Sequence, residues 1–332
     1  IWVTSVLWLR HRLRSSSISM KYYGLQSQIR KNNINSVLLL LMFPLVFYAL
    51  AWLFFLLMSI GMEDQEMKLE FVNRSFLHTV PWITIGVLVW FTIAWFSHTT
   101  IINLATNSKP LERKENKRVY NLVENLCIST GMKMPRVNII EDNSLNAFAS
   151  GINEKTYTVS LSRGIIDRLE DDELEAVIAH ELTHIRNRDV RLLIISIVFV
   201  GIFAYITEML FRSLRFGNMG RGKKESRGIF IAMFLALIGY LLASLFRFAL
   251  SRKREYLADA GAAELTRRPL SLASALRKIS VDPTIEAVKR KDVAQMFIEN
   301  PGEPEEKTSF SFANLFATHP PIEKRIKLLE QY

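Results

Sequence analysis

Four long apolar blocks limit what this chain of 332 residues can fold into. Residues 36–61 and 80–96 carry no charged side chain, and residues 192–209 and 229–250 carry one each. An α-helix rises 1.5 Å per residue, so roughly 20 apolar residues cross the ~30 Å hydrocarbon core of a bilayer. The blocks predict a mainly α integral membrane protein with about four transmembrane helices. The last two blocks fit either full crossings or a buried hairpin, and both readings stay open.

The polar stretches between the blocks define the remaining organisation. Short strand patterns between residues 135 and 162 alternate with helical patterns, so the soluble part is expected to be α+β. The expected order is a basic N-terminal segment at 1–35, in which 1–19 are an upstream extension; a first span at 36–61; an extracytoplasmic loop at 62–79; a second span at 80–96; the first part of the soluble domain at 97–191; two apolar helices at 192–250 with a basic loop at 210–228; and the second part of the soluble domain at 251–332.

The distribution of charge predicts an orientation in the membrane. Residues 1–35 contain six Lys or Arg and no acidic residue, whereas loop 62–79 contains four acidic and two basic residues. Positively charged loops stay in the cytoplasm, so the N-terminus and residues 97–191 are expected there. The basic loop 210–228 conflicts with this scheme, because two further crossings would place it on the opposite side.

Composition excludes two classes of protein. The net charge is +10, but the basic residues cluster beside the apolar blocks, where Lys and Arg meet lipid headgroups. We therefore expect a lipid bilayer as partner and no nucleic acid. Cys127 is the single cysteine, so no intrachain disulfide forms and a disulfide-stapled secreted domain is excluded.

The stretch VIAHELTHIRNRD at 177–189 carries the strongest chemical signal. His180 and His184 stand four residues apart, so in a helix they project from one face and can hold one Zn²⁺. Glu181 is turned aside from that face, within reach of a water on the metal as its general base. The apolar neighbours would bury the motif, and a buried His-Glu-His cluster without a metal leaves polar groups unpaired. The alternative is a polar patch that matches the motif by chance.

A third ligand is expected downstream, and the candidates are His319 and the carboxylates in SRKREYLADAGAAEL at 251–265. Glu255 and Asp259 are again four apart, so one carboxylate can bind zinc while the other hydrogen-bonds the free nitrogen of a ligand histidine. The alternative is a solvated face of paired charges. Two apolar blocks lie between this stretch and the histidines, so both ends can meet on one side of the membrane.

Four motifs resemble the HtpX family of membrane-embedded zinc metalloproteases, which are gluzincins related to the CaaX prenyl protease. They are HELTH at 180–184, REYLADA at 254–260, NAFASG at 146–151 and ATHPPIEKRI at 317–326. The resemblance covers most of the chain from Met20 onward. It implies a zincin-like protease domain on the cytoplasmic side, joined to the transmembrane helices.

The resemblance also implies a role for each matching residue. His180, His184 and Glu255 would bind one Zn²⁺ per chain, Glu181 would activate the water, and Asp259 would orient a ligand histidine. Asn146, Ala147 and Phe148 would lie on an edge strand beside the cleft, where the substrate backbone can add as a further strand. His319 would stabilise the oxyanion, although THPP also fits a simple helix start.

The expected function is endopeptidase cleavage of misfolded or damaged membrane proteins, as protein quality control in a bacterial inner membrane. Its partners would be membrane-protein or unfolded polypeptide substrates and the bilayer; the oligomeric state is left open. The alternatives are a CaaX-type prenyl-protein protease and a membrane scaffold without catalysis. Intact motif residues speak against the scaffold.

Overall fold

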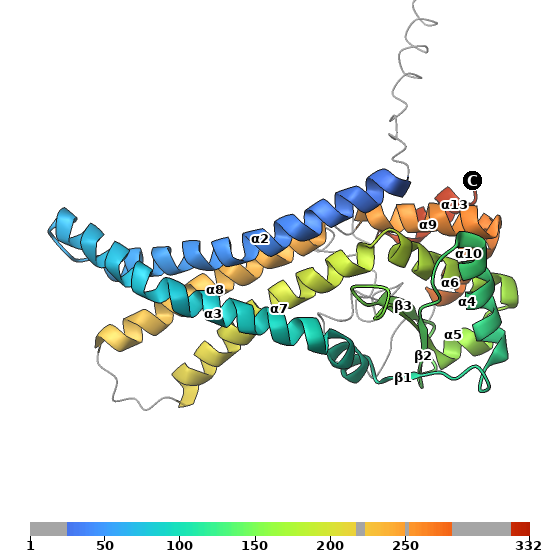
Figure 1. Ribbon diagram of the computed structural model, residues 1–332, viewed down its shortest axis with the longest axis horizontal. Coiled ribbons are helices and arrows are strands. Elements are labelled where there is room, and N and C mark those ends of the chain that lie inside the picture. The colour runs from blue at the N-terminus through green and yellow to red at the C-terminus, as the bar shows by residue number, and fades with distance from the viewer. Residues whose placement is uncertain (1–24, 217–222, 250–251, 281–319) are drawn as a thin grey trace, which may run out of the picture.

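The computed structural model describes residues 25–216, 223–249, 252–280 and 320–332 (Figure 1). The expectations for residues 1–19 and for His319 lie outside these ranges. Long helices run side by side over most of the molecule, and a globular domain with a small sheet sits at one end of them. This is the predicted class, a mainly helical membrane protein with an attached α+β domain.

The long helices are α2 (Leu25–Met58), α3 (Gln65–Thr106), α7 (Asp189–Phe216) and α8 (Lys223–Ala249). In the described part of the chain, the first three are long and apolar enough to cross a bilayer, while the apolar part of α8 is shorter, at Arg227–Ala243. Only 11% of the residues in the most apolar stretch of α2 and of α3 are buried inside the protein, and side chains such as Leu41 and Trp82 are exposed. Exposed apolar surface of this extent indicates contact with lipid.

Helix α3 is longer than the apolar block that predicts it. Residues 65–79, expected to be a loop, are helical. Asp64 caps this helix by accepting hydrogen bonds from the backbone N–H groups of Glu66 and Met67. Glu, Met, Lys and Leu follow the cap and all favour a helix. Apolarity marks the membrane-facing part of a helix, whereas capping decides where the helix begins.

Helices α7 and α8 form an antiparallel pair that extends away from the globular domain alongside α2 (Figure 1). Phe43 and Phe47 of α2 pack against Phe199 and Phe203 of α7, with ring centroids 4.4 and 4.7 Å apart. At the far end, Arg227 donates hydrogen bonds to the carbonyls of Leu57 and Ile60, at the end of α2. The last two apolar blocks therefore run the length of the bundle and do not fold back into the globular domain.

The globular domain contains a four-stranded sheet in the order β1-β2-β4-β3. Strands β2 and β4 are parallel, and the two outer pairs are antiparallel. The strands are β1 (Ser108–Pro110), β2 (Arg136–Ile140), β3 (Ala147–Ser150) and β4 (Thr158–Ser162); the helices are α4 (Lys117–Thr130), α5 (Arg163–Arg168), α6 (Asp171–Arg186), α9 (Arg252–Thr266), α10 (Pro269–Ile279) and α13 (Ile322–Leu329).

Helix α6 lies at the centre of this domain, against β3, α9 and α10. Its apolar side chains, such as Leu174 and Ile178, join Phe148 and Leu161 of the sheet in one core. The helix starts with a capping box, as the acidic residues at 171–173 suggest. In this box Glu173 also accepts hydrogen bonds from α10. The helix that carries the HELTH motif is thus held rigidly at its start and along its length.

Candidate metal centre

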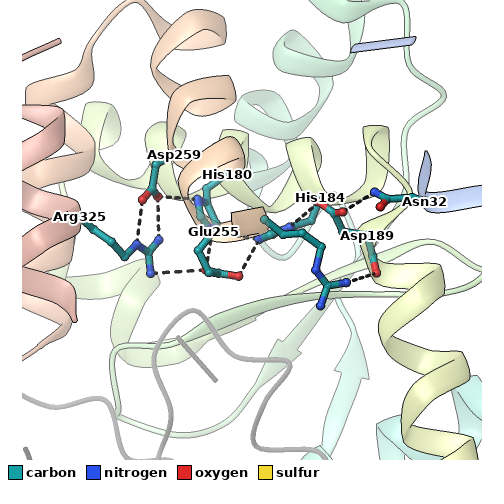
Figure 2. A network of polar contacts seen from close by, with 8 residues as sticks. Asn32, His180, His184, Asp189, Glu255, Asp259 and Arg325 are labelled. Atoms are coloured by element: carbon teal, nitrogen blue, oxygen red, sulfur yellow. Dashed lines mark hydrogen bonds and ion pairs between the residues drawn. The ribbon is translucent and has the colours of Figure 1, made fainter. Parts of the chain in front are cut away.

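Three side chains from two helices converge at the end of α6 that faces the membrane bundle (Figure 2). His180 and His184 lie on α6, and Glu255 lies in the first turn of α9. The two Nε2 atoms are 3.2 Å apart, and the Glu255 carboxylate oxygens lie 3.7 Å from His180 Nε2 and 3.6 Å from His184 Nε2. Two ligands bound tetrahedrally at roughly 2.0–2.1 Å from zinc are about 3.3–3.4 Å apart. The three groups could therefore hold a metal ion with little movement.

The close contact between α6 and α9 depends on Gly261. A Cβ atom at this position would lie 2.4 Å from Cγ2 of Thr183 and 2.9 Å from its Oγ1. Thr183 stands between the two zinc-ligand candidates on α6. Since only glycine fits there, α9 can approach α6 closely enough to bring Glu255 to the histidines.

Each histidine also meets a carboxylate at its second ring nitrogen (Figure 2). His180 Nδ1 is 3.0 Å from Asp259 Oδ1, and His184 Nδ1 is 3.2 Å from Asp189 Oδ2. A carboxylate at Nδ1 favours the tautomer whose Nε2 lone pair is free to bind a metal. Asp259 lies where the sequence predicts. Asp189 was not identified from the sequence. The feature that could have indicated it is its position five residues after His184, at the start of an apolar block.

Arg325 was also missed, although it belongs to the quoted stretch ATHPPIEKRI. This α13 side chain is 1% exposed and donates two hydrogen bonds to Asp259, at 2.9 and 2.7 Å. Its Nη1 is 3.6 Å from Glu255 Oε2. Burial alone would raise the pKa of Asp259, but Arg325 and the contact with His180 outweigh burial and lower that pKa. Asp259 therefore stays ionised beside His180.

Whereas Arg325 lowers the pKa of Asp259, the carboxylates beside His180 raise the pKa of that histidine. Burial tends to lower the pKa of His180, but Asp259 and Glu255 overcome this and raise it to about 9. The metal-free centre therefore keeps a proton on this imidazole at neutral pH. A divalent cation would take the place of that proton.

Glu181 is buried beside the centre, at 2% exposure. Its carboxylate accepts a hydrogen bond from the backbone of Ala149 in β3. Burial raises its pKa, and the nearby histidines offset only part of this effect. A carboxylate with a raised pKa is suited to accept a proton and release it again near neutral pH.

The predicted substrate-binding residues lie at the edge of the sheet, as expected, but their side chains are fully buried. Phe148 belongs to the domain core, so its side chain serves packing and only its backbone is suited to a substrate contact. Asn146 Oδ1 accepts a hydrogen bond from the N–H of Ala147, and Asn146 pairs through its backbone with Ser162. The edge position was thus predictable, whereas the burial of this strand was not.

Comparisons with known proteins match the part of the chain that carries this centre. A family model described as Peptidase family M48 matches residues 113–332, which include α6 and α9. A Protease HtpX homolog of Bacteroides fragilis is 57% identical over 322 residues, covering 94% of this chain and 100% of the relative. A Protease HtpX homolog of Dictyoglomus turgidum is 40% identical over 255 residues, covering 74% of this chain and 81% of the relative.

Among solved structures, the crystal structure of S. mikatae Ste24p matches with a TM-score of 0.46 at 17% identity, over 91% of this chain and 66% of that chain. The family model spans both ligand-bearing helices, and the similarity to the Bacteroides fragilis protein extends over the membrane helices as well. The protein is an integral membrane metalloprotease, and the chain belongs to peptidase family M48, among the HtpX-type proteases.

Proposed function

We propose that this protease is a zinc-dependent endopeptidase that cleaves misfolded or damaged membrane proteins at the cytoplasmic face of a bacterial inner membrane. The observation that carries the proposal is the spacing of 3.2–3.7 Å among His180 Nε2, His184 Nε2 and the Glu255 carboxylate. These distances lie within about 0.4 Å of those in a tetrahedral zinc site, and catalytic sites with three protein ligands leave the fourth position open.

Zinc and the residues of the chain would contribute different parts of peptide-bond hydrolysis. Bound zinc supplies Lewis-acid polarisation of the scissile carbonyl and lowers the pKa of water. His180, His184 and Glu255 would hold the ion, while Asp259 would fix the ring of His180 through its contact with Nδ1. Glu181 takes the proton from the attacking water and delivers it to the nitrogen of the leaving amine. Its raised pKa supports both steps, because the group must gain and lose one proton in each cycle.

The place of the centre supports a membrane-bound substrate. Helix α7 begins at Asp189, five residues after His184, which is about 8 Å at 1.5 Å per helical residue. A polypeptide that emerges from the bilayer would meet the centre directly. The charge asymmetry between residues 1–35 and 62–79 supports a cytoplasmic location. The resemblance to HtpX supports a role in quality control.

Cleavage of an unfolded model protein by the full chain in detergent tests the proposal. Wild type is compared with Glu181→Gln, and each preparation is checked for one zinc per chain. Glu175→Gln is the matched control, since Glu175 lies on the same helix and is only half-buried. We expect cleavage by wild type and by the control, and zinc binding without cleavage by Glu181→Gln.

The other outcomes distinguish the alternatives. If all variants hold zinc and none cleaves, a prenylated peptide becomes the next substrate to test. If Glu181→Gln cleaves as well as wild type, the assignment of the general base is wrong. If wild type holds no zinc, the proposed metal is wrong.

A further inference from the structure

Asp189 connects a zinc-ligand candidate to the membrane bundle. It is the first residue of α7, is 3% exposed, and places Oδ2 3.2 Å from His184 Nδ1. Helices α6 and α7 are joined through Arg188, which adopts the left-handed conformation with φ 60°. This turn lets the first residue of α7 face back toward the last turn of α6. The carboxylate can therefore orient the imidazole whose Nε2 faces the other ligands.

The second oxygen of Asp189 is held by the first membrane helix. Asn32 of α2 donates from Nδ2 to Asp189 Oδ1 at 2.6 Å and to the carbonyl of Asn187 at 2.9 Å (Figure 2). A side-chain amide has two N–H donors, and both have an acceptor here. Asn32 is also 2% exposed. The orientation of the amide is thus fixed. Each oxygen of the Asp189 carboxylate has a partner, because Oδ1 accepts from Asn32 and Oδ2 faces His184 Nδ1.

Apolar packing keeps Asn32 at this place. Leu39, two turns further along α2, packs with Leu192 and Ile195 of α7 in a small buried cluster. This contact fixes α2 against α7 close to Asp189. A change in the packing of these two helices would shift Asn32, then Asp189, and finally His184.

We infer that Asp189 and Asn32 are positioning residues of the metal centre, so that the first membrane helix completes the support of His184. The inference rests on the proposed zinc site and goes beyond it by making zinc affinity depend on the packing of α2 against α7. A merely structural contact between α2 and α7 would change stability but leave the metal centre unaltered. The decisive measurement is therefore made on the metal.

The experiment uses the full chain in detergent and measures zinc affinity by competition with a chromophoric chelator. Asp189→Asn is expected to weaken zinc binding about 10–100-fold, as loss of a carboxylate partner of a ligand histidine does. Asn32→Leu keeps the volume but removes both donors, and acts through Asp189, so we expect a smaller loss of about 3–10-fold. The absorption spectrum of the Co²⁺-loaded chain should change in both variants, because the geometry around His184 changes.

Asn33→Leu is the matched control. Asn33 is the next residue of the same helix, but its Oδ1 accepts a hydrogen bond from Arg188 at 3.0 Å and does not touch the carboxylate. We expect its zinc affinity and cobalt spectrum to equal those of wild type. The double variant Asn32→Leu/Asp189→Asn should bind zinc no more weakly than Asp189→Asn alone, since both changes act on one contact chain.

Two results would overturn the inference. One is a folded Asn32→Leu chain with the zinc affinity and cobalt spectrum of wild type. The other is a double variant whose fold loss of zinc affinity equals the product of the fold losses of the two single variants. If Asn32→Leu does not fold, Asn32→Ser, which keeps one donor, is judged by the same criteria. Wild type without zinc would instead contradict the proposed function itself.

Discussion

Replacing Arg325 by methionine tests how the C-terminal helix supports the metal centre. The guanidinium is 1% exposed, donates two hydrogen bonds to Asp259 and lies 3.6 Å from Glu255 Oε2. Methionine has similar length and is apolar, so packing is largely kept while the charge is lost. Removing one partner of a buried ion pair costs about 3–5 kcal/mol. We expect a loss of this size in the free energy of unfolding at pH 7.

The pH dependence gives the prediction a second criterion. Arg325 lowers the pKa of Asp259, so the pair contributes stability above the unfolded pKa of about 3.9 and loses it as pH falls through the lowered value. In Arg325→Met, Asp259 takes up a proton more readily, and the cost of burying its charge without the guanidinium then disappears. The difference between variant and wild type should therefore shrink as pH falls toward 4.

The matched control is Glu330→Gln on the same helix. Glu330 pairs with Arg277 of α10, and both side chains are about half exposed. Exposed pairs contribute about 0–1 kcal/mol. The free energy of unfolding of all three proteins is measured by urea unfolding of the detergent-solubilised chain, with pulse proteolysis as the readout. The reasoning is refuted if Arg325→Met costs no more than Glu330→Gln, or if its cost is the same at pH 7 and pH 4.

Three further predictions concern the same domain. Gly261→Ala should separate α9 from α6, destabilise the chain by about 1–3 kcal/mol and weaken zinc binding. In the double variant, Thr183→Ala should restore part of the stability and part of the zinc affinity. Absence of any rescue would contradict the contact between Gly261 and Thr183. Since His180 has a pKa of about 9 without metal, zinc binding should release a proton at neutral pH and strengthen as pH rises toward 9, which calorimetry in buffers of different ionisation enthalpy checks. Glu173→Gln should cost about 1–3 kcal/mol at pH 7, and because the pKa of Glu173 is lowered, this cost should fade in urea titrations as pH drops below the unfolded value of about 4.3.

The parts of the centre that the sequence predicts are those with local spacing. His180 and His184 share a face because a helix turns by 3.6 residues, and Glu255 and Asp259 do so for the same reason. No tertiary information enters either step. Likewise, the alternation in TYTVSLS predicts β4, which spans Thr158–Ser162.

The supporting residues could not be predicted in this way. Asp189 meets Asn32 across 157 positions of the chain, and Arg325 meets Asp259 across 66. Each is a single polar residue without a periodic pattern, in a chain with 42 Lys or Arg and 32 Asp or Glu. Only burial separates these residues from the solvated majority, and burial follows from helix packing. For the same reason the family resemblance implies an edge strand in NAFASG at 146–151, whereas the burial of β3 (Ala147–Ser150) becomes visible only in the structure.

The charge balance of the centre gives an independent argument for a divalent cation. Within the described residues, four buried carboxylates surround the two histidines: Glu181, Asp189, Glu255 and Asp259. Two buried guanidinium groups lie among them, because Arg325 pairs with Asp259 and Arg254 Nη1 donates to the carbonyl of Asp189. With all four carboxylates ionised and both imidazoles neutral, the cluster lacks two positive charges. Uncompensated buried charge is costly, and the metal-free chain reduces it by raising the pKa of His180 and Glu181. One ion of charge +2 at the histidines would supply the full difference, for which the metal-free cluster would need two protons.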